Sequence, residues 1–218
     1  MLRIAIDGPA GSGKSTIAKR LADLFNITYI DTGAMYRAVA WLALKFNLSD
    51  DKLLNKLADV DIKLNKNSVI IIIDGKEYDV TDEIRLPDVT KLTGEIAAND
   101  KIREILVRMQ KNMAETTSVI MDGRDIGTVV IPDAEVKVFL TADPAERAKR
   151  RYNELIQKGV SVDFDTVYKD LLERDYRDEN REASPLKKAE DAIEIDTTNL
   201  TIEDVVDKIC DIVRMRGF

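Results

Sequence analysis

Apolar residues come in short runs along this chain, and stretches with helical spacing separate these runs. The runs predict buried strands at Leu2–Ile6, Ile27–Ile30, Val119–Met121, Val136–Leu140 and Ala192–Ile195. Strands that alternate with helices are typical of an α/β fold, in which a parallel sheet carries helices on both faces. Ligands bind such sheets at the carboxyl ends of the strands, and polar residues directly follow several of these runs.

One segment breaks the alternation. Residues 61–81 contain three strand-like stretches, which Asn65–Ser68 and Asp74-Gly75 separate. Because an Asp-Gly pair between strands is a strong hairpin signal, we expect a small antiparallel insert here. Its run Ile70–Ile73 is expected to be the core-facing strand. Amphipathic helices are predicted around the insert, at 33–46, 50–58 and 100–114.

The stretch GPAGSGKST follows the first predicted strand and fits the phosphate-binding pattern G-x-x-x-x-G-K-[ST]. Glycines let successive backbone N–H groups point inward, and the helix predicted at Ser15–Phe25 adds its positive N-terminal end. Lys14 can reach the β- and γ-phosphates, and the Ser15 hydroxyl can bind Mg²⁺. The alternative, a glycine-rich turn without a ligand, fits the flanking strand and helix less well. The predicted ATP-binding residues are Gly8, Pro9, Ala10, Gly11, Ser12, Gly13, Lys14, Ser15 and Thr16.

Composition narrows the classes of function. The 218 residues are 44% hydrophobic and 33% charged, which suits one globular domain with room for small inserted subdomains. The net charge of −7 argues against a general nucleic-acid-binding surface. The chain has no histidine, which excludes Ser-His-Asp and Cys-His mechanisms and histidine metal sites. Phosphoryl transfer remains, because it depends mostly on backbone groups, Lys, Arg and Mg²⁺.

The single cysteine, Cys210, allows no disulfide within the chain and fits a reducing cytoplasm. It lies in an amphipathic stretch and is expected to be a small buried hydrophobe. The sequence begins with a strand and a loop rather than a signal-peptide pattern, and its apolar runs are too short to span a bilayer. We therefore expect no membrane partner.

Two further stretches point to a second anion site. In DTGAMYR, Asp31 or Thr32 can cap a helix and Arg37 lies one turn in, although a plain helix cap explains Thr32 equally well. In DGRD, Asp122 can act as the acidic partner of Mg²⁺ through water, and Arg124 projects where phosphates should lie. The alternative for Arg124 is an ordinary Asp–Arg ion pair.

The region from residue 147 to 181 is rich in arginine. Two sets have helical spacing and would each share a helix face: Arg147, Arg150 and Arg151, then Arg174, Arg177, Asp178 and Arg181. The second set continues the apolar stripe of Val167 and Leu171, which is typical of a face turned to a phosphate-filled cleft. The alternative is pairing with the nearby acids Asp170, Glu173 and Glu179. A segment that closes over a triphosphate excludes water from the γ-phosphate, which favours a kinase over a simple ATPase.

Six motifs in order, IAIDGPAGSGKST, DTGAMYR, VTDEIR, MDGRDIGTVVIPDA, ERAKRR and ERDYRDENREASPL, resemble those of the bacterial-type cytidylate kinase family. The resemblance covers nearly the whole chain. The combination of DGRDIGTVV with an RDxxDxxR-like spacing near the C-terminus is far more specific than the phosphate loop alone. It implies Mg²⁺-dependent transfer of the ATP γ-phosphate to CMP or dCMP, giving ADP and CDP or dCDP. It also implies a cytoplasmic monomer whose partners are these small molecules, with neither nucleic acid nor membrane.

The resemblance implies a fold as well: one nucleoside monophosphate kinase unit over residues 1–218. Its core would comprise 1–32, 116–148 and 182–218. A monophosphate-binding domain at 33–115 would hold the β insert at 61–81, and a helical lid would occupy 149–181.

The family's site residues carry over to matching positions. By resemblance, the substrate-binding residues are Thr32, Arg37, Arg103, Arg124, Asp125, Arg174, Asp178 and Arg181. Among them, Arg37 and Arg124 would hold the acceptor phosphate, with Thr32 at the CMP site where many members carry serine. Arg103 would help to fix the base or the monophosphate-binding domain, and Asp125 would contact the base region. Asp178 and Arg181 would hold the ribose hydroxyls, and Arg174 the moving phosphates. The implied catalytic residues are Lys14, Arg124, Arg150 and Arg174, with Ser15 as the metal ligand and Arg147 and Arg151 on the lid side.

Gly94 departs from the family pattern, because some members have a serine there that contacts cytosine. Selectivity among CMP, dCMP and UMP therefore stays open. The DGFPR-like motif of adenylate kinases is absent. Two other classes remain: a P-loop kinase for AMP, UMP or another metabolite, and a nucleotide-gated switch. The chain lacks the guanine-reading N-K-x-D motif of switch GTPases, and a switch function would leave the arginine-rich region unexplained.

Overall fold

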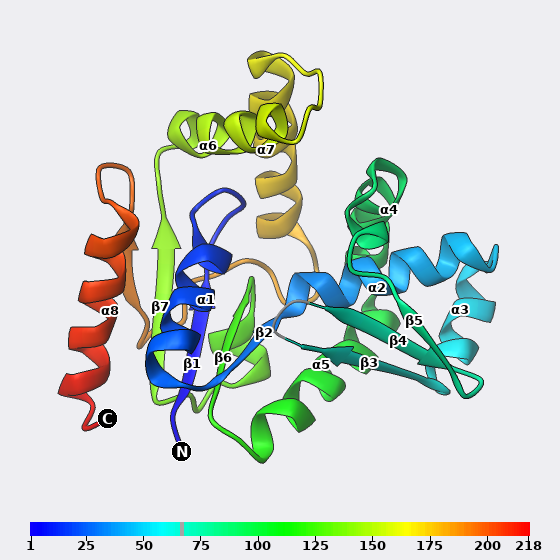
Figure 1. The fold of residues 1–218 in the computed structure, drawn as a ribbon, viewed down its shortest axis with the longest axis horizontal. Coiled ribbons are helices and arrows are strands. Elements are labelled where there is room, and N and C mark those ends of the chain that lie inside the picture. The colour runs from blue at the N-terminus through cyan, green and yellow to red at the C-terminus, as the bar shows by residue number, and fades with distance from the viewer. Residues whose placement is uncertain (66–67) are drawn as a thin grey trace. The chain divides into compact units, whose positions relative to one another are not determined.

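The computed structural model describes residues 1–65 and 68–218, which form two compact units (Figure 1). The first unit comprises Met1–Ile27 and Ser118–Phe218, and the second comprises Thr28–Thr117. The proposed lid at 149–181 lies within the first unit. Its status as a separate moving part stays a prediction.

The parallel sheet that the short apolar runs predict is present. Its strands, in order across the sheet, are β2 (Thr28–Asp31), β6 (Val119–Gly123), β1 (Arg3–Asp7), β7 (Val136–Thr141) and β8 (Ile193–Asp196). The central strand β1 pairs in parallel with β6 and β7, and β7 pairs in parallel with β8. Each predicted strand is confirmed to within two residues at its ends. The inner strands β6, β1 and β7 are largely buried as expected, whereas the edge strands β2 and β8 bury only Ile30 and Ile195.

The helices of the first unit cover the sheet and carry the arginine-rich region. They are α1 (Lys14–Phe25), α6 (Pro144–Gln157), α7 (Phe164–Asn180) and α8 (Ile202–Met215). Helix α1 packs on β6, α8 packs on β7, and the two helices pack on each other, so they share one face of the sheet. Helices α6 and α7 pack together (Figure 1). Both arginine sets lie in these helices as expected, except Arg181, which follows the last residue of α7 and has extended backbone. A π-helical turn at Ile126–Val130, which the sequence did not predict, follows β6.

Helix α8 begins with a capping box, in which Thr201 and Asp204 each accept a hydrogen bond from the other's backbone N–H. Cys210 lies on this helix and is half-buried rather than fully buried as expected. Within the described part of the chain, none of the helices combines the length and the apolar character that crossing a membrane requires.

The second unit contains the predicted antiparallel insert, formed by β3 (Val60–Leu64), β4 (Val69–Ile73) and β5 (Lys76–Asp79). Asp74 and Gly75 both have positive φ, 51° and 72°, as a two-residue type I′ hairpin turn requires. The separator predicted at Asn65–Ser68 includes residues 66 and 67, which lie outside the described residues. The run Ile70–Ile73 lies in β4, which faces the core as expected, through Ile71 and Ile73. Successive side chains of a strand point to opposite faces.

The helices of the second unit pack around the insert. They are α2 (Thr32–Lys45), α3 (Asp50–Leu57), α4 (Pro87–Ala98) and α5 (Asp100–Glu115), with a 3₁₀ turn at Glu83–Arg85. The predicted helices α2, α3 and α5 are confirmed to within one residue at each end. Helix α4 was missed, because Thr90, Thr93 and Gly94 weaken its helical pattern. One core joins these elements and includes Leu42, Leu53, Ile62, Ile71, Ile84 and Ile102.

Candidate active site

The phosphate loop owes its path to glycine. Gly8, Gly11 and Gly13 have φ of 145°, 74° and 91°, a range that side chains rarely allow. A Cβ on Gly8 would lie 2.0 Å from the Leu140 backbone oxygen, and one on Gly11 would lie 2.9 Å from the Arg147 backbone oxygen. Two of the three glycines are therefore required by close backbone packing as well as by φ. Gly13 ends the loop as the N-cap of α1.

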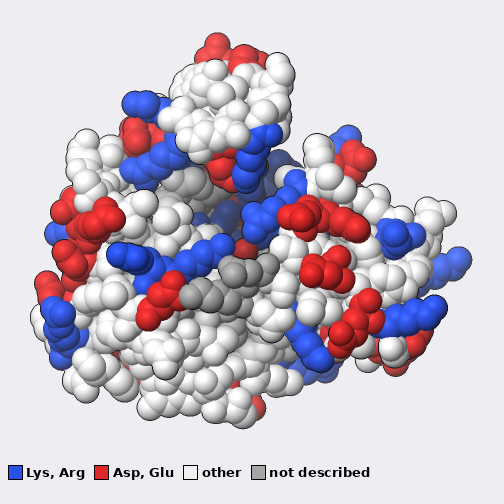
Figure 2. Space-filling view, in the orientation of Figure 1, with Lys and Arg blue, Asp and Glu red and all other residues white. Residues whose placement is uncertain are grey.

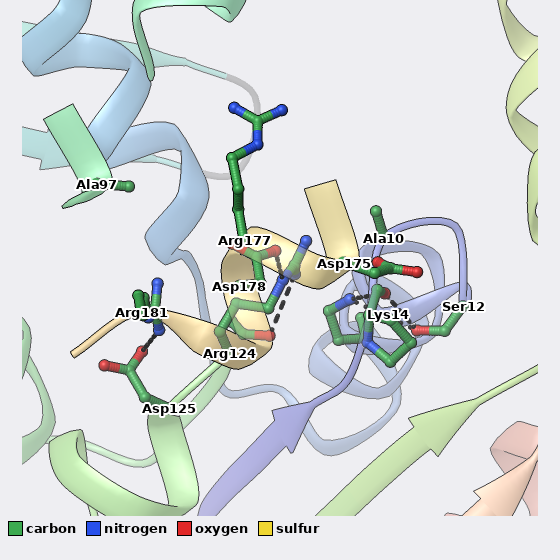
Figure 3. Close-up of polar contacts among 12 residues, drawn as sticks. Ala10, Ser12, Lys14, Ala97, Arg124, Asp125, Asp175, Arg177, Asp178 and Arg181 are labelled. Atoms are coloured by element: carbon green, nitrogen blue, oxygen red, sulfur yellow. Dashed lines mark hydrogen bonds and ion pairs between the residues drawn. The ribbon is translucent and has the colours of Figure 1, made fainter. Parts of the chain in front are cut away.

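Lys14 is buried and folds back over the loop. Its Nζ donates to the Pro9 carbonyl at 2.7 Å and contacts Ser12 Oγ at 3.5 Å (Figure 3). Burial lowers the pKa of Lys14 well below its usual value, and the positive charges of Arg124 and Arg174 lower it further. The fold thus gathers three cations where a polyanion would relieve their repulsion.

Ser15 and Asp122 meet at the first turn of α1. The Ser15 hydroxyl donates to Asp122 Oδ2 at 2.8 Å, and Asp122 is a buried residue of β6. A hydroxyl and a carboxylate are oxygen ligands of the kind that Mg²⁺ prefers. The pair beside the phosphate loop therefore fits a magnesium ion. Thr16, the last residue of the predicted ATP-binding set, is exposed on α1.

Asp7 joins the phosphate loop to the segment after β6. Its carboxylate accepts hydrogen bonds from the backbone N–H groups of Ile126 at 2.8 Å and Gly127 at 2.7 Å. Burial raises the pKa of Asp7 to about 6, although these two hydrogen bonds and Lys14 oppose the rise. The residue holds the π-helical turn that directly follows Arg124 and Asp125. Asp7 is one of the polar residues that directly follow the predicted strands, but its support of this turn was not predicted.

Arg124 and Asp178 form an ion pair between the loop after β6 and helix α7. Arg124 Nε donates to Asp178 Oδ2 at 2.8 Å, as Figure 3 shows. Burial alone would raise the pKa of Asp178, but the charges of Arg124, Arg174 and Arg181 outweigh it and hold that pKa low. An Asp–Arg pair was the alternative to phosphate binding by Arg124. The pair exists, and it uses the Nε side of the guanidinium.

Arg181 and Asp125 form a second, longer contact nearby, with Nη2 and Oδ1 3.8 Å apart. Arg181 Nε also donates to the Ser184 carbonyl at 2.6 Å. Figure 3 shows Arg181 and Asp125 pointing toward each other from α7 and from the loop after β6. Predicted acceptor-site residues of the first unit therefore lie together.

The charged stripe on α7 differs from the one expected. The apolar stripe of Val167 and Leu171 continues into Asp175, which is buried, and not into Arg174, which is exposed. Arg177 is exposed, its Nε donates to the Glu173 carbonyl, and it points away from Asp178 (Figure 3). Residues four apart repeat on one face, so Leu171 pointed to Asp175, a signal that the arginine count obscured.

The three arginines of α6 do not act as one phosphate-facing set. Arg147 is buried, and its contacts are described below. Arg150 binds Thr197, with Nη1 2.9 Å from Oγ1 and Nη2 2.6 Å from the carbonyl oxygen, and it also contacts Glu146. Arg151 pairs with Glu154 near the surface. The catalytic role expected for Arg150 stays a prediction. In the structure, Arg150 holds the chain after β8 through its hydrogen bonds to Thr197.

In the second unit, Asp31 and not Thr32 caps α2, because its Oδ1 accepts the Ala34 N–H at 2.8 Å. Asp31 also pairs with Arg37 at 3.0 Å. Thr32 is buried, and the plain-cap explanation for it is wrong. Asp31 therefore fixes both the start of the helix and the guanidinium of Arg37.

Arg103 is held within the second unit by an aromatic ring and a carbonyl. Its guanidinium lies over the Tyr36 ring, 5.4 Å from the centroid, and Nη1 donates to the Ala97 carbonyl at 3.3 Å. Only 3% of Arg103 is exposed. The sequence indicated Arg103 through the family motif, whereas Tyr36 as its support was missed.

The chain is similar to known proteins along nearly its whole length. A family model described as cytidylate kinase matches residues 4–215. The cytidylate kinase of Clostridium botulinum (strain Langeland) is 50% identical over 216 residues, which cover 98% of each chain. The cytidylate kinase of Clostridium perfringens (strain 13) is 50% identical over 212 residues, 96% of each chain. The solved shikimate kinase of Bacteroides thetaiotaomicron has a TM-score of 0.53 at 15% identity and covers 98% of both chains, which shows a shared fold.

Proposed function

The chain belongs to the cytidylate kinase family, and we propose that it transfers the γ-phosphate of ATP to CMP or dCMP. The single observation that carries this proposal beyond family membership is the set of cations at the phosphate loop. Lys14, Arg124 and Arg174 are close enough for the two arginines to lower the pKa of the lysine. Asp122 and Asp7 offset part of the charge on Lys14, and the remaining cluster of basic groups beside the phosphate loop suits a polyanionic ligand.

We propose that the reaction is a direct in-line transfer. An oxygen of the acceptor phosphate attacks the γ-phosphorus, the bond to the ADP oxygen breaks, and no covalent enzyme intermediate forms. No general base is required, because a phosphate monoester is largely ionised at pH 7. Lys14, Arg124 and Arg174 stabilise the charge that spreads over the transferred group.

Mg²⁺ is proposed as the cofactor, and Ser15 and Asp122 would hold it. When bound, the ion neutralises charge on the β- and γ-phosphates. The two residues already lie in hydrogen-bond contact, so binding requires little rearrangement of the chain. Arg150 is proposed to assist by holding Thr197, whose hydroxyl donates to the Ser12 carbonyl at 3.3 Å.

The acceptor roles remain proposals based on the family match and on local geometry. Asp178 and Arg181 would hold the ribose, Asp125 the base region, and Arg124 the acceptor phosphate. The contacts of these residues with one another support a shared task. In the second unit, Arg37 is proposed for the acceptor phosphate and Thr32 for the CMP site.

Arg103, also of the second unit, is proposed for the base. The neighbour of Gly94 does not restore the missing serine, because the Thr93 hydroxyl donates to the Val89 carbonyl of its own helix at 2.7 Å. Cytosine selection would then depend on Arg103 and Asp125. We further expect the enzyme to act as a cytoplasmic monomer, which sedimentation and cell fractionation would test.

The deciding experiment measures ADP release from ATP and Mg²⁺ with CMP, dCMP, UMP, AMP or GMP, and with no acceptor. We expect strong stimulation by CMP and dCMP. Stimulation by a different monophosphate would preserve the kinase mechanism and change the substrate. A high rate of ADP release without an acceptor, which no added nucleotide changes, would contradict the kinase proposal and favour an ATPase or switch.

A further inference from the structure

Arg147 ties three parts of the first unit together. It lies on α6 and is 4% exposed. Its Nε donates to the Ala142 carbonyl at 3.0 Å, which anchors the side chain at the start of its own helix. Its Nη1 donates both to the Ala10 carbonyl of the phosphate loop at 3.0 Å and to Asp175 Oδ2 of α7 at 2.5 Å. One guanidinium nitrogen therefore touches the loop and the helix at once.

The phosphate loop also packs against Arg147 through its backbone. A Cβ on Gly11 would come within 3.0 Å of Arg147 Cβ, so only glycine allows the loop to lie this close. Ala10 precedes this glycine, and its carbonyl oxygen is the one that Arg147 binds. A change of loop conformation cannot occur without displacing either this hydrogen bond or the arginine.

On the other side, Asp175 belongs to a helix that carries proposed acceptor residues. Asp175 is 7% exposed, and its Oδ1 is buried without a hydrogen-bond partner. Arg174 is its neighbour, and Asp178 lies one turn further along α7. The position of Asp175 thus sets where Asp178 meets Arg124.

We propose that the Arg147–Asp175 pair couples the phosphate loop to α7, so that occupation of the ATP site raises affinity for the acceptor nucleotide. Both are positioning residues and neither touches the substrate. The proposal rests on the function proposed above. By thermodynamic linkage, the acceptor must raise affinity for ATP by the same factor.

The chemistry of the pair supports a coupling role over a purely stabilising one. A buried ion pair contributes little net stability compared with apolar side chains of the same volume. What it adds is geometry, because the planar guanidinium presents donors at fixed angles to two acceptors. A lysine has one nitrogen on a flexible stem and would hold Asp175 or the Ala10 carbonyl less rigidly.

The test is calorimetric titration of CMP with and without adenylyl imidodiphosphate and Mg²⁺, a non-hydrolysable stand-in for ATP. In the wild type we expect the analogue to tighten CMP binding by about fivefold or more. In Arg147→Lys the ratio should fall toward one, while CMP binding without the analogue changes less than about twofold. Glu154→Gln, which alters an exposed carboxylate of α6, is the matched control and should keep the wild-type ratio.

A second variant guards against misfolding of the first. Arg147→Met combined with Asp175→Leu replaces the pair by apolar groups and leaves no buried charge alone. It should fold, as circular dichroism would show, and it should lose the coupling. A wild-type ratio near one, or a ratio unchanged in either variant, would overturn the proposal. Absence of any CMP binding by the wild type would instead refute the proposed substrate, so the two failures are distinguishable.

Discussion

At the scale of single residues, burial decides what the charged groups do. Asp7 and Lys14 are both buried, and each is shifted toward its neutral form. The Asp7 carboxylate accepts hydrogen bonds from two backbone N–H groups. The Lys14 ammonium, in contrast, is repelled by the charges of Arg124 and Arg174. The first is therefore a fixed support, and the second is a group that an anionic ligand would stabilise.

The raised pKa of Asp7 predicts an unusual dependence of stability on pH. Because the folded protein binds the proton more tightly than the unfolded chain, the free energy of unfolding should fall as pH rises from about 4 to 6. A rise in pKa from 3.8 to about 6 corresponds to about 3 kcal/mol over that window. Urea unfolding of the wild type and of Asp7→Asn between pH 4.5 and 7.5 measures how the free energy of unfolding changes with pH. Relative to the variant, the wild type should lose stability as pH rises.

Unfolding is a better readout here than activity, because a phosphate monoester also titrates near pH 6. Asp133→Asn is a control of opposite sign. Hydrogen bonding to Arg3 lowers the pKa of Asp133, so its contribution is lost as pH falls. Identical pH slopes for the wild type and Asp7→Asn would show that Asp7 is not shifted.

The surroundings of Lys14 predict that replacing it lowers activity without lowering the stability of the folded protein. Lys14→Met should lower kcat by about 100-fold or more, because a group that stabilises the transition state is lost. Without nucleotide, the variant should be at least as stable as the wild type, because it removes the cost of burying the lysine charge and the repulsion from Arg124 and Arg174. Thermal unfolding with and without ATP measures this, with exposed Lys19→Met as the control on the same helix. A clear loss of stability in the absence of ATP would contradict the repulsion.

At the scale of elements, the candidate site is built where segments after strands meet helices. The segment after β6 supplies Arg124 and Asp125, and α7 supplies Asp178 and Arg181. Two ion pairs join these elements, and Asp7 fixes the turn between them and the sheet. The geometry of the site thus depends on contacts between elements rather than on either element alone.

The pair between Arg124 and Asp178 predicts a selective effect on the acceptor. Asp178→Asn should raise KM for CMP about 10-fold or more, because it removes the charge that orients Arg124 and the proposed ribose contact. KM for ATP should change by less than about threefold. Steady-state kinetics with each substrate varied would show this, with Asp170→Asn as an exposed control on α7. An unchanged KM for CMP would count against the ribose role.

At the scale of the whole molecule, local and net charge have opposite signs. The chain has 33 basic and 40 acidic residues, a net charge of −7. Figure 2 shows acidic and basic side chains interspersed over the visible surface. Anionic substrates must therefore be attracted by the arginines and Lys14 against a weakly repulsive background.

This contrast predicts how salt affects the enzyme. Between about 0.1 M and 1 M KCl the Debye length falls from about 10 Å to 3 Å. If the local cations dominate, KM for CMP should rise several-fold, while kcat should change less because the proposed lid would shield bound substrate from solvent. Initial rates at constant Mg²⁺ would measure both parameters, with potassium acetate separating screening from chloride binding. A fall in KM with salt would mean that the net negative charge dominates.

The parts of the fold that the sequence predicted are those defined by interactions between residues close together along the chain. The sheet, the hairpin at Asp74-Gly75 and most helices come from periodicity and turn chemistry, which involve neighbours along the chain. Helix α4 was missed because its pattern is weak and packing compensates. The sequence indicated Arg124, Asp178 and Arg181, which the structure brings together, and their roles stay predictions. It gave no role to Asp7, Asp175 or Tyr36, which support neighbouring site residues.

What the sequence determined by itself was the phosphate loop, because its glycines, Lys14 and Ser15 are contiguous and their chemistry is local. The family motifs added a set of residues predicted to bind the acceptor. Only the tertiary structure decided which charges are buried and with whom they pair. Asp7 meets Ile126 across 119 positions and Arg147 meets Asp175 across 28, distances that no periodicity encodes. Such contacts arise when strands and helices pack, and burial then sets their strength.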